Sequence, residues 1–168
     1  MHITRSVEVN APAKRVWALL GEGFAELTWA RTISSSRLEG ALGVGAVRVC
    51  TFEPSLLVSA GAARERLVEF EPQRGVFAYE LLEPSAPIRS AGSRWQVEEA
   101  GVERSRVTVA STIALTPMGR MLSPLVRLMT LRLMRSTFAD LEAGLQQATP
   151  TARRTPPQPG LPERSARP

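Results

Sequence analysis

The sequence predicts an α+β fold in which a curved antiparallel sheet is covered by a long C-terminal helix. A series of strand-like segments of alternating polarity fills residues 33–115, and residues 117–147 change to helical periodicity. The connections between the strand segments have hairpin length. They favour an antiparallel meander over β-α-β units, which need a helix between consecutive strands.

The N-terminal region predicts one strand and two short helices. Residues 3–9 alternate between apolar and polar side chains, as a half-buried strand does. Pro12 then stands in the first turn of a helix, where its missing N–H is harmless, and this helix ends near residues 21–23. A second short helix is predicted over residues 24–30, with Trp29 near its end.

Six further strands and the last helix follow. The strands are predicted at residues 33–38, 46–52, 62–70, 76–82, 93–97 and 106–115, with turn formers at 40–45, 72–75, 83–87 and 100–101. Ser123 and Pro124 are suited to cap and open the long part of the C-terminal helix. Together with the strand at residues 3–9, these segments predict a sheet of about seven strands.

Three glycines in GALGVGAVRVCTF raise the question of a phosphate-binding loop. Such a loop needs a helix directly after the glycines, and the P-loop also needs a Lys-Ser or Lys-Thr pair. Here AVRVCTF, a strand-like segment, follows Gly40, Gly43 and Gly45. We therefore interpret the glycines as hairpin and bulge residues, which need positive φ.

Composition indicates one domain over residues 1–149 and a disordered tail over residues 150–168. The tail holds six of the 13 prolines, four arginines and one glutamate. Without it, 21 basic and 16 acidic residues become 17 and 15, so the net charge falls from +5 to +2. The excess charge belongs mostly to the tail, which argues against a nucleic-acid-binding domain.

Several other classes of protein are excluded on composition. The N-terminus lacks the apolar core of a secretory signal, and three arginines interrupt the apolar region 118–134, so we expect a cytoplasmic protein. Cys50 is the single cysteine and His2 the single histidine. These counts exclude an internal disulfide and a Ser/His/Asp triad in the interior, and we expect neither a metal site nor a cofactor.

Three segments carry a resemblance to a known family: VEVNAPAKRVWALL, LEGALGVGAVRVCTF and ERLVEFEPQRGVFAYEL. Over residues 3–147 the chain resembles the START-like (SRPBCC) superfamily with its Bet v 1-like helix-grip fold, and within it the polyketide cyclase/dehydratase-like members. GVGAVR at residues 43–48 is similar to the family's G-x-G-x-x-R, and TPMGR at 116–120 resembles its entry into the last helix. The resemblance implies a large apolar cavity that holds lipids, polyketides or hormones.

The resemblance also implies which strand faces line this cavity, since side chains alternate with period two. The implied cavity residues, strand by strand, are Arg48, Cys50 and Phe52; Glu65 and Leu67; Phe77, Tyr79 and Leu81; Trp95; and Ala110, Thr112 and Ala114. In the last strand the small residues are preferred because they leave room for a ligand, although Val107, Val109 and Ile113 are the more apolar set. Trp29 is assigned equally to the cavity entrance or to the core.

The chemistry implied for the cavity rests on three polar side chains. Arg48 would anchor a ligand carbonyl, enolate or carboxylate, Glu65 would accept a hydroxyl or act as a base, and Tyr79 would donate a proton. An equal alternative is a structural Arg48–Glu65 ion pair between two strands. For Tyr79 a core role is preferred. Cys50, with no histidine to activate it, is interpreted as a small hydrophobe.

The sequence therefore predicts a protein that binds a hydrophobic small molecule, with a polyketide cyclase/aromatase-like enzyme as the first hypothesis. The alternatives are a non-catalytic lipid or metabolite carrier or sensor, and a chaperone-like interaction module. Residues 121–134 of the last helix are apolar nearly all round, so one of its faces needs a partner. A homodimer contact is preferred there over a transient contact with a membrane surface.

Overall fold

The protein is described by a computed structural model that covers residues 1–27, 29–52 and 61–147. Seven strands form one sheet: β1 (His2–Val9), β2 (Ile33–Glu39), β3 (Val47–Phe52), β4 (Gly61–Glu71), β5 (Val76–Leu81), β6 (Ile88–Gly101) and β7 (Arg104–Leu115). The helices are α1 (Ala13–Leu20), α2 (Ser123–Gln147) and three short 3-10 helices, η1 (Glu22–Ala25), η2 (Pro72–Arg74) and η3 (Met118–Leu122).

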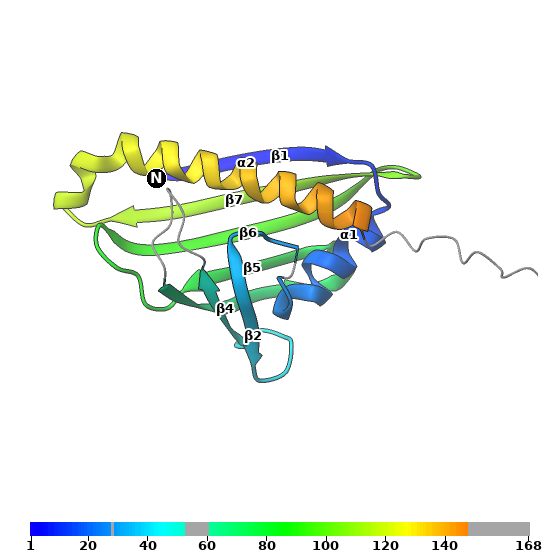
Figure 1. Cartoon of the computed structure of the whole chain (residues 1–168), viewed down its shortest axis with the longest axis horizontal. Helices are drawn as coiled ribbons and strands as arrows, with labels where there is room; N and C mark the ends of the chain where they lie inside the picture. The colour runs from blue at the N-terminus through cyan, green and yellow to red at the C-terminus, as the bar shows by residue number, and fades with distance from the viewer. Residues whose placement is uncertain (28, 53–60, 148–168) are drawn as a thin grey trace, which may run out of the picture.

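The sheet is an antiparallel meander with one crossover. Its strand order is β1-β7-β6-β5-β4-β3-β2, so the first strand pairs with the last. In Figure 1 the sheet curves and α2 crosses one face of it alongside β1 and β7, while α1 lies beside the C-terminal end of α2. This is the helix-grip α+β fold that the sequence predicted.

The main core lies between the concave face of the sheet and the helices. Trp17 and Leu20 of α1, Phe138 and Leu141 of α2 and Trp95 of the sheet belong to one buried cluster there, in which the Phe138 and Trp95 rings are in contact. The buried α2 residues Met134, Phe138, Leu141 and Leu145 recur at spacings of three and four, which places them on one side of the helix. All of them lie within the last 14 of the 25 residues of α2.

Two element predictions need correction. The second helix predicted over residues 24–30 is a single 3-10 turn, η1, and the chain from Glu26 to Thr32 is not helical where it is described. The strand predicted over residues 93–97 extends over all 14 residues of β6. The remaining strands lie within one or two residues of their predicted bounds. The predicted tail, residues 150–168, lies outside the described residues.

The β2–β3 connection has the geometry expected of a turn. Gly40 has φ +91° and Gly45 has φ +93°, conformations that favour glycine because it lacks a Cβ. Gly43, which was predicted to serve the same purpose, does not adopt positive φ. No helix follows these glycines, since β3 begins at Val47.

The predicted orientation of the last strand is wrong. Residues Val107, Val109 and Ile113 of β7 are buried, whereas Thr112 is exposed and lies beside His2 on the opposite face. Ala110 and Ala114 share the Thr112 side, because alternate residues of a strand share a face. Cross-strand pairing gives the reason: Val109 lies opposite Trp95, and Trp95 faces the core.

Candidate ligand-binding pocket

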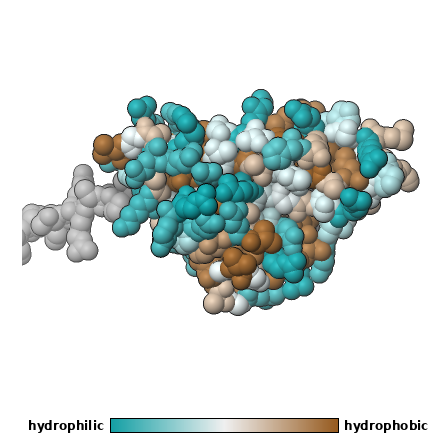
Figure 2. All heavy atoms as spheres, turned by 180° about the vertical axis from the view of Figure 1, so that it is seen from behind, coloured by the Kyte–Doolittle hydropathy of each residue, from teal (hydrophilic) through white to brown (hydrophobic). Residues whose placement is uncertain are grey.

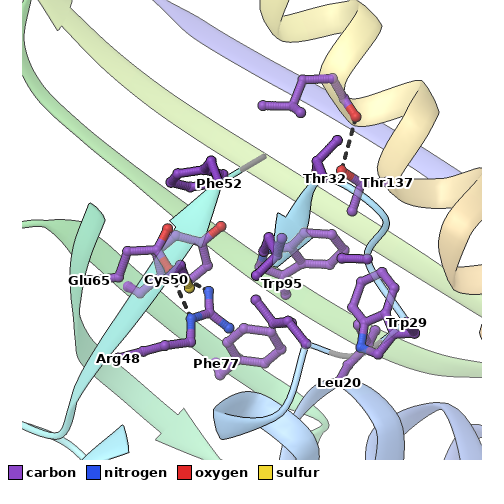
Figure 3. Close-up of a pocket in the computed structure, with 15 residues that line it drawn as sticks. Leu20, Trp29, Thr32, Arg48, Cys50, Phe52, Glu65, Phe77, Trp95 and Thr137 are labelled. Atoms are coloured by element: carbon purple, nitrogen blue, oxygen red, sulfur yellow. Dashed lines mark hydrogen bonds and ion pairs between the residues drawn. The ribbon is translucent and has the colours of Figure 1, made fainter. Parts of the chain in front are cut away.

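A pocket lies on the concave side of the sheet, beside the main core, and holds a volume of about 170 Å³. Its walls come from five strands, from α1, from the segment before β2 and from α2 (Figure 3). Arg48, Glu65 and Cys50 lie together on one side of it, and Trp29 and Leu20 on the other. The pocket is thus apolar over most of its wall and ionised at one side.

The ionised side consists of an ion pair between adjacent strands. Arg48 of β3 and Glu65 of β4 are direct cross-strand partners, so their side chains leave the same face of the sheet. The Arg48 Nε and Nη2 groups both donate to Glu65 Oε2, at 2.9 and 2.5 Å. The side chains of Arg48 and Glu65 are only 5% and 14% exposed. The pairing compensates charges that would be costly to bury singly.

The Arg48 guanidinium is also held by the helical segment that follows α1. Its Nη1 donates to the Phe24 carbonyl oxygen at 2.9 Å, and its Cζ lies 3.9 Å from the centre of the Phe24 ring. Burial, the largest single effect, would lower the pKa of Arg48, but the charge and hydrogen bond of Glu65, together with smaller contributions from Tyr79 and Cys50, outweigh burial and raise it. Arg48 is therefore permanently cationic and committed to contacts within the protein.

Glu65 keeps one oxygen for other partners. Both Arg48 donors use Oε2, and the Cys50 thiol lies 3.9 Å from the same atom. Within the described ranges, no group donates a hydrogen bond to Oε1. Glu65 lines the pocket, and a carboxylate oxygen without a donor in the protein accepts hydrogen bonds from hydroxyl or N–H groups.

Tyr79 and Cys50 are neutral groups in this setting. Burial raises the pKa of the Tyr79 phenol, and the nearby Glu65 charge raises it further. Burial likewise raises the pKa of the Cys50 thiol, against a smaller opposing effect of Arg48. Tyr79 can therefore donate but not act as a base, and Cys50 is not an activated nucleophile.

The structure brings most of the predicted site residues together. Arg48, Glu65 and Tyr79 all line the pocket, as do Trp29, Cys50, Phe52, Phe77 and Trp95. Three predicted ligand-binding residues do not. Leu67 is fully buried in the main core, Leu81 is half-buried and outside the pocket wall, and Thr112 is exposed on the other face of the sheet.

Sequence reasoning missed seven pocket residues, and all but Ile33 of β2 come from outside the strands. These are Leu20, Leu27, Ala30, Thr32, Ile33, Leu133 and Thr137. Leu133 and Thr137 stand four residues apart in α2, and this spacing on one helix face was a usable signal. The residues just before β2 gave no such signal, because the helix predicted over residues 24–30 is replaced by a 3-10 turn that ends at Ala25.

Two contacts fix this segment against α2. The Asp140 carboxylate accepts hydrogen bonds from the Arg31 backbone N–H at 3.1 Å and from Arg31 Nε at 2.6 Å, and Asp140 is almost completely buried. One turn further on, Gly144 packs directly on Trp29, where a Cβ would lie 2.7 Å from the Trp29 Cβ. These contacts set the position of the Trp29 side of the pocket.

Across the described ranges, no cluster of three or more His, Cys, Asp or Glu side chains could hold a metal ion. The polar groups in the pocket wall are the Arg48–Glu65 pair and the Tyr79 phenol, with Thr32, Thr137 and the Cys50 thiol as weaker polar groups. This arrangement suits a ligand that is apolar over most of its surface and carries a hydrogen-bond donor at one end.

Comparison with models of protein families shows which family the chain belongs to. The model for polyketide cyclase / dehydrase and lipid transport proteins matches residues 1–147. The chain belongs to this family. It therefore belongs to the superfamily that the sequence resembled, and the match spans the whole described domain. No curated protein matches the chain.

Solved structures of other proteins share the fold of this family member. The ZhuI aromatase/cyclase from Streptomyces sp. R1128 has a TM-score of 0.75 at 16% identity, covering 91% of this chain and 98% of its own. A START superfamily protein from Mycobacterium smegmatis has a TM-score of 0.72 at 14% identity, with coverages of 88% and 99%. Norcoclaurine synthase from Thalictrum flavum has a TM-score of 0.67 at 16% identity, with coverages of 88% and 94%.

Proposed function

We propose that this protein binds a small hydrophobic molecule in the pocket between the sheet and α2, with one polar end of that molecule at Glu65. The observation that carries this proposal is the composition of the pocket wall. Leu20, Leu27, Ile33, Phe52 and Leu133 supply apolar surface, and among the described wall residues the only ionised groups are the two of the Arg48–Glu65 pair. Such a wall favours an apolar ligand and orients it through a few polar contacts.

The volume limits the size of this ligand. A cavity of about 150 Å³ is large enough for a benzene-sized molecule, and this pocket holds about 170 Å³. The ligand we propose therefore has roughly one aromatic ring, or an aliphatic body of similar size, in the enclosed part. A polyketide or lipid with a larger body would extend out of the pocket.

The polar contacts set the chemistry of the ligand's end. Arg48 already donates to Glu65 and to the Phe24 carbonyl, so Glu65 Oε1 is the better placed group for a ligand. A carboxylate oxygen accepts, and the ligand should therefore present a hydroxyl, phenol or N–H donor. This reverses the expectation that Arg48 anchors a ligand carbonyl or carboxylate.

Catalysis is a second candidate function, favoured by the same oxygen. A carboxylate that can reach a bound hydroxyl or acidic C–H is placed to act as a general base, with Tyr79 as a neutral donor beside it. The ZhuI aromatase/cyclase and norcoclaurine synthase, whose folds this chain shares, are enzymes by name. If Glu65 acts as a base on the bound molecule, the protein is a cyclase/dehydratase-like biosynthetic enzyme. If Glu65 only binds that molecule, the protein is a carrier or sensor.

Native mass spectrometry of the full chain tests the binding proposal. We expect a discrete small-molecule adduct, either co-purified or acquired from one-ring phenols added to the protein, and denaturing extraction to identify it. Thr137→Phe should abolish the adduct, because Thr137 lines the pocket and the larger ring fills it. Thr112→Phe is the matched control, since Thr112 is exposed on the opposite face and should leave binding unchanged.

The outcome separates the candidates. A wild-type chain that neither carries nor acquires an adduct contradicts the binding proposal. Given an identified ligand, Glu65→Gln distinguishes the two roles, because the amide keeps the shape but cannot act as a base. An enzyme loses turnover of that ligand while still binding it. A carrier shows no turnover in the wild type and only a change in affinity in the variant.

A further inference from the structure

The N-terminal half of α2 is apolar but is not buried by the rest of the protein. The first buried side chain of this 25-residue helix is Met134, so none of the preceding eleven residues is buried. Large apolar side chains are exposed here and in the adjoining η3, namely Met118, Met121, Leu122, Leu125, Leu128 and Leu133. Met118 and Met121 are 78% and 85% exposed, so this surface needs a partner.

The charges on this surface all have one sign. From Arg104 to Ala139 the sequence contains six arginines and no aspartate or glutamate. Four of them, Arg120, Arg127, Arg132 and Arg135, are exposed on η3 and α2. We call these four arginines, with the exposed apolar residues named above, the helix patch. In Figure 2 brown and tan apolar atoms lie among teal ones at the end of the molecule away from the grey segment, where α2 begins.

The patch arginines differ from most arginines of the sheet. On the sheet, Arg64, Arg66, Arg94 and Arg106 each pair with a glutamate. Among the described residues, no patch arginine has an acidic partner within ion-pair distance. These cations are therefore available to a negatively charged partner outside the chain.

We infer that the helix patch docks on an anionic lipid surface. A helix that combines exposed apolar side chains with unpaired arginines places the former at the acyl boundary and the latter at the lipid phosphates. A second copy of the chain fits less well, because a two-fold contact centred on the patch would bring two sets of four arginines together. A nucleic acid would match the charge but would leave the apolar side chains exposed.

The contact we infer is with the membrane surface. In the ranges that the structure describes, no helix is both long enough and apolar enough to cross a bilayer. The inference is independent of the proposed ligand, since it rests on the exposed side of α2 and η3 alone.

Co-sedimentation of the full chain with vesicles tests the inference. We expect binding to vesicles of phosphatidylcholine mixed with phosphatidylglycerol, and much weaker binding to phosphatidylcholine alone. The double variant Arg127→Glu with Arg132→Glu should weaken binding by at least about fivefold per site, the effect of about 1 kcal/mol per arginine near an anionic surface. The double variant Leu125→Ser with Leu128→Ser should also weaken it, because buried apolar area contributes to such binding.

Two substitutions outside the helix patch serve as matched controls. Val102→Ser changes an apolar residue that is 90% exposed in the β6–β7 turn, and Arg5→Glu changes an exposed arginine of β1. Both should bind as the wild type does. Circular dichroism checks the folding of every variant. If the double leucine variant does not fold, the double arginine variant still tests the inference.

Three results would overturn the inference. The first is that the wild type does not bind anionic vesicles, or binds them no better than phosphatidylcholine alone. The second is that binding survives both patch variants and is lost when the tail arginines Arg153, Arg154, Arg164 and Arg167 are changed to serine in the full chain. The third is a dimer in light scattering that dissociates in the Leu125→Ser, Leu128→Ser variant, which would assign the patch to a second copy.

Discussion

The side-chain chemistry of the pocket is set by one buried ion pair whose two halves have unequal freedom. Arg48 is held by Glu65, by the Phe24 carbonyl and by the Phe24 ring. Among the described contacts, Glu65 is held only through Oε2. The sequence left two roles open for this pair, a structural bridge or a ligand contact, and the two are compatible. Arg48 forms the bridge through Glu65 Oε2, and Glu65 Oε1 is left for a ligand.

Because the Arg48–Glu65 pair is buried, breaking it should cost more stability than breaking an exposed ion pair of the same sheet. Arg48→Ala should lower the free energy of unfolding by about 3 kcal/mol, because it leaves the Glu65 carboxylate largely buried without its partner. The double variant Arg48→Met with Glu65→Met should recover most of that loss. Urea denaturation measures both. The exposed pair Arg66–Glu80, also between adjacent strands, is the matched control, and Arg66→Ala should cost at most about 1 kcal/mol. Equal losses for the two alanine variants would contradict the assignment.

The raised pKa values of Cys50 and Tyr79 predict a stability that falls at alkaline pH. Each group favours its neutral form in the folded protein. As the pH rises past the ordinary thiol pKa of about 8.5, the unfolded state loses the Cys50 proton first, which lowers the free energy of unfolding by up to about 1.4 kcal/mol per pH unit. Cys50→Ala should lessen this alkaline slope in denaturation measured between neutral and alkaline pH. Parallel curves for the two proteins would refute the prediction.

The sequence predicted individual pocket residues correctly where strand alternation and the family motif agreed. Arg48, Cys50 and Phe52 share a face because they alternate along β3, and all three line the pocket. The same alternation cannot say which of the two faces is inward. In β7 a preference for small residues gave the wrong face, because pairing with Trp95 decides it.

At the scale of elements, the pocket depends on how closely α2 approaches the segment before β2. Gly144 permits contact with Trp29, and Asp140 binds Arg31, so two positions one turn apart fix the same segment. Neither contact was predictable. A glycine inside a helical pattern gives no indication of the partner that approaches it, and an aspartate on the last helix gives none of a hydrogen bond across 109 residues of chain.

Gly144→Ala is the substitution that tests this approach. In an unhindered helix the change stabilises by up to about 1 kcal/mol. Here the added Cβ would lie 2.7 Å from the Trp29 Cβ, a position close to the backbone that cannot move freely. We therefore expect a net loss of about 1–3 kcal/mol, as in overpacked cores, seen as a lower midpoint in thermal denaturation.

The neighbouring position supplies the control. Ala143 is exposed, and Ala143→Gly should cost only the usual glycine penalty of about 0.5–1 kcal/mol. A Gly144→Ala variant more stable than the wild type would show that α2 and Trp29 are not in close contact.

At the scale of the whole molecule, the family fold was predictable and the size of its pocket was not. The succession of strands along the chain, the turns and the terminal helix follow from hydrophobic periodicity and from the positions of turn-forming residues in the sequence, whereas the pairing of β1 with β7 does not. The volume depends instead on side-chain packing. Here Tyr79, Phe77 and Trp95 stack side by side in the pocket wall, with the Phe77 ring centre 6.4 Å from that of Tyr79 and 6.1 Å from that of Trp95. The large cavity implied by the family resemblance is thus a small one.

The partner of the exposed half of α2 was also not determined by the sequence pattern. The sequence indicated a helix apolar nearly all round and favoured a dimer contact, whereas the unpaired arginines around it favour a lipid surface. Leu133 is both exposed on α2 and part of the pocket wall, so the proposed membrane contact lies beside the proposed ligand site.

The most direct test of the proposed binding site is a crystal structure of the full chain soaked with 4-bromophenol, which has one ring, a donor hydroxyl and an anomalous scatterer. We predict a bromine peak inside the pocket, between Trp95 and Leu133, and the phenol oxygen within hydrogen-bond distance of Glu65 Oε1. Bromine density found only outside the pocket, or an empty pocket at saturating concentration, would contradict this mode of binding.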